Sequence, residues 1–489
     1  MGEKRILAFD FGASGGRAMI GMYDGETLRL KEIHRFSNDP VTVQKTVYWD
    51  VLRLFYEIKQ GMIKAKHDGG FECIGIDTWG VDFGLLDQNG NLLENPIHYR
   101  DERTKGMIEK SFEYIPKERF YQITGNQFME LNTVFQLLSL KLNRPELLER
   151  ADKLLLTPDL FSYFLTGEKH AEHSIASTTQ MMDANARAWS DEVLEQLGIP
   201  RKLLCDIIPS GTIAGHLSDA ICEELELESV PVAAAASHDT QSALIAVPAK
   251  EDDFIFLSCG TWSLLGTELK EPIINAKSEK YNITNEGGHE GTISFLKNII
   301  GLWLIQESRR QWIREGEEYG FGELESMAKG VTKLQSFIDP DASEFGTQGN
   351  IPRRIRAYCE RTGQKIPDTI GAVVRCINES LALKYRMALE EIEDCTGKNY
   401  DTIYMVGGGT QSKLLCQFTA DSCGRRVVAG PVEATVLGNL ALQLVALGEI
   451  KDLKEARALI ARSQDITVYE PQDTEAWNEA YDRFKKVIL

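Results

Sequence analysis

One stretch near the start of the chain decides the fold: Ile6-Leu7-Ala8-Phe9-Asp10-Phe11-Gly12-Ala13-Ser14-Gly15-Gly16-Arg17-Ala18-Met19-Ile20-Gly21-Met22. Four apolar residues lead into Asp10, and a segment with three glycines and an arginine separates them from a second apolar run. Short apolar runs of this kind predict buried strands. The glycine-rich segment is therefore expected to be a loop that joins two strands, rather than a turn from a strand into a helix.

The residues of this loop suit a bound phosphate. Glycines let successive backbone N–H groups point into one concavity that binds anions. Arg17 can add positive charge, and Asp10 can hold Mg²⁺ through its carboxylate or a bound water. The alternative is an ordinary hairpin turn with a surface arginine. The stretch matches neither a Walker A loop, since no Gly-Lys-Ser/Thr follows, nor the dinucleotide-binding fingerprint.

The same design occurs a second time. Residues 254–266, FIFLSCGTWSLLG, again place a small polar loop between two apolar runs, directly after a linker candidate at 248–253. The repeat predicts two domains, 1–247 and 248–489, each beginning with a strand, a phosphate loop and a second strand. The two loops are expected to face one nucleotide from opposite sides.

Composition narrows the range of partners. The 489 residues carry a formal net charge of −19, which argues against a nucleic acid or an anionic membrane as partner but not against a nucleotide. The nine cysteines form no CxxC pair and indicate a reducing compartment. The N-terminus shows no signal-peptide pattern, and no apolar run approaches the roughly 18 residues of a membrane span. A cytoplasmic protein is expected.

Two segments of the first half are candidates for binding a sugar. Trp79-Gly80 follows a predicted strand at 73–76, and an indole ring beside a glycine is a common carbohydrate-binding arrangement. A buried core tryptophan is the equally weighted alternative. Tyr99–Arg103, which includes Arg100, is by default a solvated run of charges and alternatively a set of hydrogen-bond partners for hydroxyl groups.

The first half of the chain contains a third candidate site segment, Ser237–Thr240, and the pattern around it predicts helices and strands. Residues 27–36 and 230–236 predict strands, and 49–66 predict a helix that Asp50 caps. Residues 104–199 are mostly helical in pattern with prolines 145, 158 and 200 as breaks, and 209–215 predict a loop. The strand at 230–236 leads into Ser237-His238-Asp239-Thr240. Asp239 or Ser237 is either the N-cap of the following helix or, for Asp239, a carboxylate that faces a cleft.

The second half offers a nucleotide-binding pattern. A flexible loop is expected over 285–291, and Asn298 and Gln306 lie near Trp303 in the sequence. A long helix is predicted from Asp368 to about Asp394, with Gly397 as its stop. The strand 402–406 then leads into three glycines at 407–409, on which a flat base or a ribose can lie directly.

Taken together, the motifs resemble those of the FGGY carbohydrate kinases. The resemblance runs in order along nearly the whole chain and is carried by Ile76-Asp77-Thr78-Trp79-Gly80-Val81-Asp82-Phe83, Tyr99-Arg100-Asp101, Ser237-His238-Asp239-Thr240, Gly260-Thr261-Trp262-Ser263 and Gly430-Pro431-Val432-Glu433-Ala434. It implies an α/β fold of two actin-like, ribonuclease H-like domains with a ligand cleft between them.

The resemblance also implies roles for individual residues. ATP would be bound by Ala13, Ser14, Gly15, Gly16, Arg17, Thr261, Gln306 and Gly408, and the sugar by Gly80, His238, Asp239, Thr240 and Asn298, with Asp239 as the general base. Trp79 and Arg100 are added as sugar-site candidates, and Asp10 as the Mg²⁺ candidate. Most of the wider family has a hydroxyl residue in place of Ala13, so backbone N–H groups and Ser14 would contact the phosphate here.

Two hypotheses for function follow. The first is a sugar kinase that uses MgATP, in which Asp239 accepts the proton of a primary hydroxyl, with L-rhamnulose, L-fuculose or another deoxyketose as substrate. The apolar wall for the methyl group of such a sugar would come from Trp79 or Phe83. The second is an ATP-gated chaperone or filament protein on the same fold, against which the sugar-site residues argue.

Overall fold

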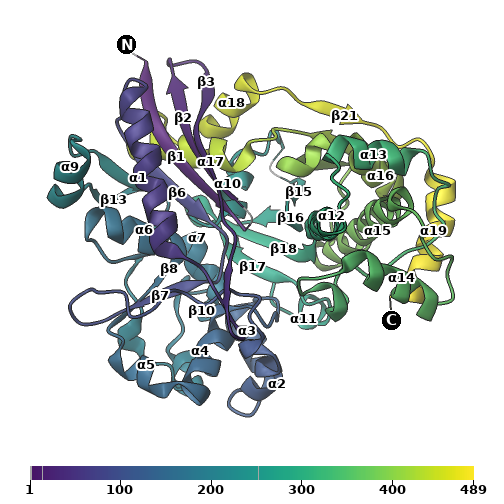
Figure 1. Cartoon of the computed structure of the whole chain (residues 1–489), viewed down its shortest axis with the longest axis horizontal. Coiled ribbons are helices and arrows are strands. Elements are labelled where there is room, and N and C mark those ends of the chain that lie inside the picture. Colours follow the sequence, from purple (N-terminus) through teal and green to yellow (C-terminus); the bar gives the residue numbers. More distant parts are fainter. Residues whose placement is uncertain (1–2, 14, 252, 489) are drawn as a thin grey trace. The chain divides into compact units, whose positions relative to one another are not determined.

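The computed structural model describes residues 3–13, 15–251 and 253–488, which form two compact units. Unit 1 comprises the described residues of Met1–Pro248, Leu269–Phe295 and Ala434–Gln464. Unit 2 comprises those of Ala249–Glu268, Leu296–Glu433 and Asp465–Leu489. Each unit is a sheet with helices packed against it (Figure 1).

Unit 1 is built on a six-stranded mixed sheet. Its order is β13 (Thr212–His216), β14 (Pro231–Ala234), β6 (Ile74–Thr78), β1 (Lys4–Gly12), β2 (Gly15–Tyr23) and β3 (Leu28–Ser37). The strands β1, β6 and β14 are parallel, whereas β2, β3 and β13 pair antiparallel with their neighbours. The predicted strand–loop–strand start of the chain is confirmed.

The other elements of unit 1 surround this sheet. The helices are α1 (Val51–His67), α2 (Met107–Ser111), α3 (Lys117–Thr124), α4 (Thr133–Asn143), α5 (Pro145–Arg150), α6 (Thr157–Thr166), α7 (His173–Ala176), α8 (Asp191–Leu197), α9 (Asp219–Leu225), α10 (Asp239–Ile245), α11 (Ala276–Lys280), α17 (Ala434–Ala446) and α18 (Leu453–Ser463). The short strands are β4 (Val41–Val43), β5 (Thr46–Tyr48), β7 (Phe83–Leu86), β8 (Lys153–Leu156), β9 (Ala171–Glu172), β10 (Met182–Asp183), β11 (Ala188–Trp189), β12 (Ile207–Ile208) and β17 (Thr284–Gly287).

Unit 2 repeats the arrangement. Its strands run in the order β18 (Ile293–Ile300), β16 (Trp262–Leu269), β15 (Ile255–Cys259), β19 (Thr402–Val406), β20 (Arg426–Ala429) and β21 (Thr467–Tyr469), and β18 begins in unit 1 beside β17. Its helices are α12 (Trp303–Arg314), α13 (Phe321–Lys329), α14 (Ile351–Arg361), α15 (Ile370–Thr396), α16 (Lys413–Cys423) and α19 (Thr474–Val487).

The two sheets share one strand pattern, which confirms the internal repeat. Strand β15 pairs antiparallel with β16 and parallel with β19, as β1 pairs with β2 and β6. In each sheet the next strand is again parallel and the last is antiparallel. The two similar sequence stretches therefore fold into the same local structure, each at the centre of its own sheet.

The faces of the unit 1 sheet are covered by different helices. The rings of Phe9 and Phe11 face α1 and α6, since a Cβ on Gly61 would lie 2.6 Å from Phe9 and Phe11 stacks on Phe161. Because side chains alternate along a strand, Asp10 points to the opposite face. That face is the one on which α17 packs, as the hydrogen bond from Asn439 to Asp77 shows.

The glycines of the first loop lie mainly in strands, which differs from the predicted three-glycine loop. Gly12 pairs with Gly15 across the hairpin, and Gly15 and Gly16 pair with β3. A Cβ on Gly16 would lie 2.3 Å from the ring of Phe36, so this glycine is required by packing. Ala13 lies in the short turn, and Ser14 is outside the described residues.

The compact units do not follow a single division of the chain. The predicted boundary at 247 and 248 lies next to the first crossing, between Pro248 and Ala249. However, α17 and α18 belong to unit 1, because α17 packs closely on α10 and on strands β1 and β6. The proposed domains 1–247 and 248–489 thus differ from the compact units at residues 269–295 and 434–464.

Two predicted helix ends are confirmed. Helix α1 has Asp50 as its N-cap, and α15 ends at Gly397 in the left-handed conformation. The long helix begins at Ile370 with Thr369 as its N-cap, two residues later than predicted from Asp368.

Other local predictions differ from the structure. Residues 212–215 of the expected loop lie in β13, which was wrong, whereas 104–199 are mostly helical as predicted, with four short strands between the helices. Pro145 and Pro158 lie in the first turns of α5 and α6, where a missing N–H costs nothing, so these prolines start helices instead of breaking them.

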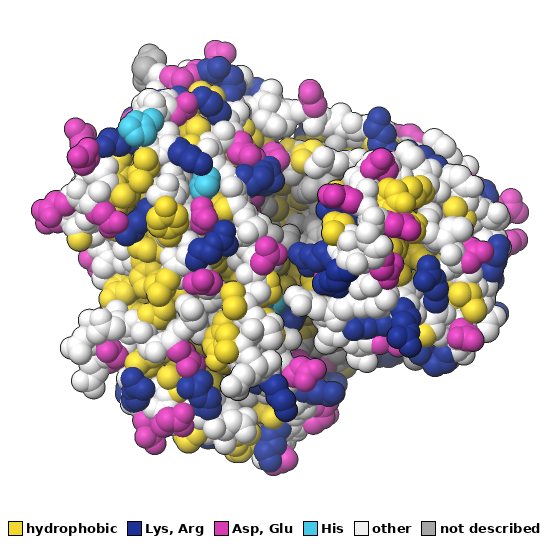
Figure 2. Space-filling view, viewed as in Figure 1, with side chains coloured by type: hydrophobic (Ala, Val, Ile, Leu, Met, Phe, Trp, Pro, Cys, Tyr) yellow, Lys and Arg dark blue, Asp and Glu magenta, His cyan; other side chains and the backbone are white. Residues whose placement is uncertain are grey.

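The surface carries charges of both signs. On the face shown in Figure 2, acidic and basic side chains are interspersed, with apolar side chains scattered between them. Among the described residues, no helix combines the length and the apolar character needed to cross a bilayer.

The contact between α10 and α17 gives a prediction about stability. A Cβ on Gly438 would lie 1.8 Å from the carbonyl oxygen of Ser242, so Gly438→Ala forces the two helices apart. Overpacking of this kind costs about 1–3 kcal/mol. We expect a lower free energy of unfolding in urea denaturation.

The control is Gly322→Ala in α13, where a Cβ meets nothing within 4 Å. This variant should gain up to about 1 kcal/mol from the better helix propensity of alanine. Equal stability of the two variants would contradict the close helix contact.

Candidate functional site

Three carboxylates lie at neighbouring strand ends in unit 1. Asp10 near the end of β1 pairs in register with Asp77 of β6. Residue His238, directly before Asp239, forms an isolated parallel bridge with Thr78, and the Thr78 N–H donates to Ser237 O at 2.9 Å. Parallel strands end at the same edge of a sheet. The fold therefore brings Asp10, Asp77 and Asp239 close enough for the charge of one carboxylate to shift the pKa of another.

Asp10 and Asp77 have different partners. Arg17 donates to Oδ2 of Asp10 at 2.7 Å from the opposite strand of the hairpin. Arg17 is therefore not a free surface arginine. Its side chain is 20% exposed and forms an ion pair with Asp10. Asn439 donates to Oδ2 of Asp77 at 2.6 Å, while Oδ1 of Asp77 accepts no hydrogen bond from the described residues. Burial and then the charge of Asp10 raise the pKa of Asp77 well above its ordinary value.

Asp239 occupies the first turn of α10 and does not cap it. The N-cap is His238, and the structure shows no side-chain cap there. The Asp239 side chain is 30% exposed and accepts a hydrogen bond from the Thr240 hydroxyl at 3.2 Å. Burial raises the pKa of Asp239, the charge of His238 lowers it, and the charge of Asp10 raises it again. The carboxylate is thus accessible and has a raised pKa.

His238 faces a carboxylate that the sequence analysis missed. Its Nδ1 lies 3.2 Å from Oε2 of Glu286, and its Nε2 lies 3.6 Å from Oδ1 of Asp239. Glu286 lies in β17, within the segment expected to be a flexible loop, and it is 4% exposed. The loop was predicted because Asn285-Glu-Gly-Gly is rich in turn-forming residues. The prediction was wrong for its first residues, which belong to β17 and pair with β18.

A second buried carboxylate supports the same loop. Glu172 is fully buried and accepts hydrogen bonds from the N–H groups of Ser174, Ile175 and Ser237. The Ser174 hydroxyl also contacts Glu172 at 2.5 Å and accepts from the N–H of His238 at 3.2 Å. The backbone that carries His238 and Asp239 is therefore fixed from a separate segment of the chain.

Trp79 is buried, as one of the two interpretations expected. It is 5% exposed, its ring centroid lies 4.1 Å from that of Trp49, and its indole N–H donates to Asp82 at 3.0 Å. Asp82 also accepts from the indole N–H of Trp49 at 2.5 Å and from the amide of Gln136 at 3.0 Å. Most of the Trp79 ring therefore belongs to the core.

The turn that presents Gly80 is strained. Val81 has φ of 70°, which is rare for a β-branched residue. Three hydrogen bonds hold its backbone: the N–H donates to Thr178, and the carbonyl accepts from Thr133 and Gln136. Gly80 has Thr178 beside it, because a Cβ there would lie 3.2 Å from that side chain.

The segment Tyr99–Arg103 is not a solvated face, so the default prediction was wrong. Tyr99 and Asp101 are 6% and 8% exposed, and Asp101 accepts from the N–H groups of Val47 and Arg103. The guanidinium of Arg100 lies 5.3 Å from the Tyr99 ring centroid. Within this segment Glu102 is exposed, whereas Asp101 is buried because backbone N–H groups satisfy its carboxylate.

Unit 2 contains the remaining candidates. The Thr261 hydroxyl donates to Gln306 Oε1 at 3.3 Å, so these two predicted nucleotide-binding residues are in contact. Asn298 lies in β18 and is partly exposed. A Cβ on Gly408 would meet nothing within 4 Å, whereas one on Gly409 would lie 2.2 Å from Sγ of Cys259. Gly409 is thus required by packing, and Gly408 borders open space.

The donor set suits Mg²⁺ better than a caged metal. The described residues contain no group of three or more His, Cys, Asp or Glu side chains that could hold a metal ion. Mg²⁺ normally keeps several waters and uses one or two carboxylates together with substrate phosphates. Asp10, with Asp77 beside it and one Asp77 oxygen unpartnered, fits that mode of binding.

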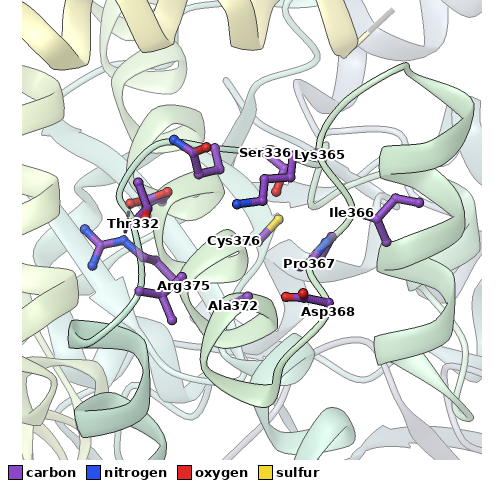
Figure 3. A pocket seen from close by; sticks show the side chains of 12 residues that line it. Thr332, Ser336, Lys365, Ile366, Pro367, Asp368, Ala372, Arg375 and Cys376 are labelled. Atoms are coloured by element: carbon purple, nitrogen blue, oxygen red, sulfur yellow. Dashed lines mark hydrogen bonds and ion pairs between the residues drawn. The ribbon is translucent and has the colours of Figure 1, made fainter.

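A pocket in unit 2 lies apart from these residues. It has a volume of about 40 Å³, and Figure 3 shows Thr332, Ser336, Lys365 and Cys376 around it. Arg375 lines it as well but donates to Glu379 at 2.7 Å and to a backbone carbonyl at 3.0 Å. None of the predicted site residues lines this pocket.

The chain belongs to the FGGY family of carbohydrate kinases. The model of the N-terminal domain of that family matches residues 5–246, and the model of the C-terminal domain matches residues 255–447. Kinases of this family use ATP and phosphorylate a sugar, so the chain is a sugar kinase. The chaperone or filament alternative is thereby contradicted.

Relatives of known name are similar over the full length. A rhamnulokinase of Bacteroides thetaiotaomicron is 42% identical over 487 residues, covering 99% of this chain and 100% of the relative. A rhamnulokinase of Enterococcus faecalis is 42% identical and covers 99% and 98%. A rhamnulokinase of Bacillus subtilis is 39% identical with the same coverage.

Solved structures confirm the mixed α/β fold. A xylulose kinase from Lactobacillus acidophilus has a TM-score of 0.79 at 17% identity, covering 99% of this chain and 97% of that one. A glycerol kinase from Plasmodium falciparum, solved with ADP, has a TM-score of 0.77 at 17% identity and covers 99% and 98%. The ligand cleft expected between the two domains stays a prediction.

The buried Asp82 gives a prediction about pH. Burial raises its pKa from 3.8 to about 6, although hydrogen bonds from Trp49, Gln136 and Trp79 lower it. A carboxyl whose pKa is raised by folding stabilises the protein below its unfolded pKa, and this stabilisation is lost as pH rises through the folded pKa. Two pKa units correspond to about 3 kcal/mol.

The test compares wild type with Asp82→Asn, which is neutral at every pH. Between about pH 7 and pH 4, the free energy of unfolding of the wild type should rise by about 2–3 kcal/mol relative to the variant. Urea denaturation at both pH values measures this difference. A difference between the proteins that does not change with pH would contradict the raised pKa.

Proposed function

We propose that this sugar kinase is a rhamnulokinase, which transfers the γ-phosphoryl group of ATP to L-rhamnulose and forms L-rhamnulose 1-phosphate in L-rhamnose catabolism. The observation that carries the proposal is the identity of about 40% with several rhamnulokinases over the whole chain. The arrangement at the end of β14 supports the chemistry, because it presents an accessible carboxylate beside an imidazole.

Asp239 is proposed as the general base. Phosphoryl transfer needs alignment, charge neutralisation and removal of one proton. Asp239 would accept the proton of the primary hydroxyl of the sugar as that oxygen attacks the γ-phosphorus. A base works best when its pKa lies near the working pH, and burial moves the pKa of Asp239 in that direction.

The sugar would be bound by residues around this base. In unit 1 the proposed contacts are Gly80 after β6, His238 after β14 and Thr240 in α10, and Asn298 of unit 2 is a further candidate. Arg100 and Trp79 stay candidates, but only the small exposed part of Trp79 is free for contact. An apolar wall recognises a methyl group by only about 1–3 kcal/mol, so L-fuculose and similar deoxyketoses are alternative substrates.

ATP would be bound by both predicted loops. In unit 1 the proposed contacts are Ala13, Gly15, Gly16 and Arg17, with Ser14 outside the described residues. In unit 2 they are Thr261, Gln306 and Gly408, and a Cβ on Gly408 would meet no atom within 4 Å, which supports its assignment to the adenosine. Arg17 can turn from Asp10 to a phosphate because it is a partly exposed side chain.

Asp10 is proposed as the carboxylate that holds Mg²⁺, directly or through water. The ion would supply positive charge to the phosphate oxygens. Asp77 beside it is held by Asn439 and shares the negative field of the site.

The test is ATP turnover with a panel of acceptors: L-rhamnulose, L-fuculose, D-xylulose and glycerol. We expect ADP release to be strongly stimulated by L-rhamnulose, with the highest kcat/KM of the panel and the phosphate attached at the 1-position. A kcat/KM for L-fuculose or D-xylulose that is tenfold or more above that for L-rhamnulose would contradict the substrate assignment. The family assignment would remain intact.

A further inference from the structure

Glu286 and His238 form a buried pair next to the proposed base. The Glu286 and His238 side chains are 6% and 9% exposed, and Oε2 of Glu286 lies 3.2 Å from Nδ1 of His238. The other ring nitrogen, Nε2, lies 3.6 Å from Oδ1 of Asp239. The imidazole therefore lies between two carboxylates, one buried and one partly exposed, and its Nδ1 makes no hydrogen bond with a described residue.

We propose that Glu286 is a positioning residue that keeps the His238 ring protonated through its ion-pair contact with Nδ1, so that the charged ring faces Asp239 with Nε2. The imidazolium then holds Asp239 in its ionised form, which is the form that accepts a proton. This inference rests on the proposed role of Asp239 as the general base.

The surroundings of His238 favour the charged ring. Of the described residues, the charged groups that act on its ring are Glu286 of β17, Asp239 of α10 and Glu172 of β9, and all three are acidic. Burial lowers the pKa of His238, but the contact with Glu286 and the charges of Asp239 and Glu172 outweigh burial, so its pKa is raised. A buried ring between carboxylates is stabilised as the cation.

Neighbouring residues hold the backbone of His238 and the side chain of Glu286. The His238 N–H is held by the Ser174 hydroxyl, and the Thr78 N–H holds the preceding carbonyl of Ser237. Glu286 is in turn approached by the Gln241 amide at 3.4 Å, and Ser294 donates to Gln241 at 2.8 Å. Both the backbone of His238 and the carboxylate that faces its ring are therefore fixed by neighbours.

The charge of His238 affects the pKa of Asp239. Burial and Asp10 raise its pKa, and the charge of His238 is the largest effect that lowers it. If the ring becomes neutral, the pKa of Asp239 rises, and the base is protonated up to a higher pH. Activity on the acidic side of the profile must then fall.

The experiment uses Glu286→Gln in the full-length enzyme. Glutamine keeps the shape and an acceptor oxygen but removes the charge. The matched control is Ser294→Ala, which breaks the neighbouring hydrogen bond to Gln241 without changing any charge. Selective ¹⁵N-histidine labelling reports the protonation of each ring nitrogen, and the signal of His238 is assigned by its loss in His238→Gln.

At neutral pH we expect both His238 nitrogens to be protonated in the wild type and in Ser294→Ala, and only one in Glu286→Gln. In Glu286→Gln the acidic limb of the pH profile of kcat/KM should move to higher pH by roughly one unit. At pH values below this limb, kcat/KM of the variant should then be about tenfold lower than that of the wild type. In Ser294→Ala the limb should not move.

A His238 signal that is the same in Glu286→Gln as in the wild type would overturn the proposal. If the ring loses its proton but the acidic limb does not move, the link from His238 to Asp239 is overturned. Failure of the proposed function would instead appear in the acceptor panel, whereas the nitrogen signals are measured without turnover.

Discussion

The structure depends on one electrostatic constraint, the meeting of carboxylates at the ends of parallel strands. Strands β1, β6 and the loop after β14 bring Asp10, Asp77 and Asp239 to one edge of the unit 1 sheet. Burial, and after it the negative charge of Asp10, raises the pKa of Asp77 well above its ordinary value. Arg17 and His238 offset part of this repulsion, each beside a different carboxylate.

A late segment of the chain completes this edge. Helix α17 belongs to unit 1 although it follows the last parallel strand of unit 2. Its Asn439 donates to Asp77, and Gln443 donates to the carbonyl of Leu7 in β1. A Cβ on Gly75 would lie 2.3 Å from the Asn439 side chain, so the strand leaves room for the amide. The carboxylates thus depend on residues more than 350 positions away in the chain.

The sequence allowed the repeated strand–loop–strand units, the third strand and the major helices to be predicted, because each depends on local apolar periodicity. The motif resemblance named the family and pointed to Asp239. Glu286 and Asn439 could not be found in this way, since their roles come from contacts with distant strands. Gly16 was assigned to a loop because a glycine in a strand is explained only by the Phe36 ring that crosses it.

Burial was the other property that local pattern did not reveal. Tyr99–Arg103 has the composition of a solvated surface, yet Asp101 is buried. Its carboxylate accepts hydrogen bonds from backbone N–H groups of β5 and of the adjacent turn, which offset the loss of water. For Trp79 the two interpretations were balanced, and the decisive partner, Asp82, sits only three residues later but is oriented by the strained Val81 between them.

The central claim is that Asp239 removes the proton of the acceptor hydroxyl. Its most direct test is the rate of sugar-dependent ADP release by Asp239→Asn, together with the affinity of that variant for the sugar in equilibrium titration. General-base catalysis contributes about 10²- to 10⁴-fold, so we predict a loss of kcat in that range with sugar affinity largely kept. A rate within tenfold of the wild type would contradict the account.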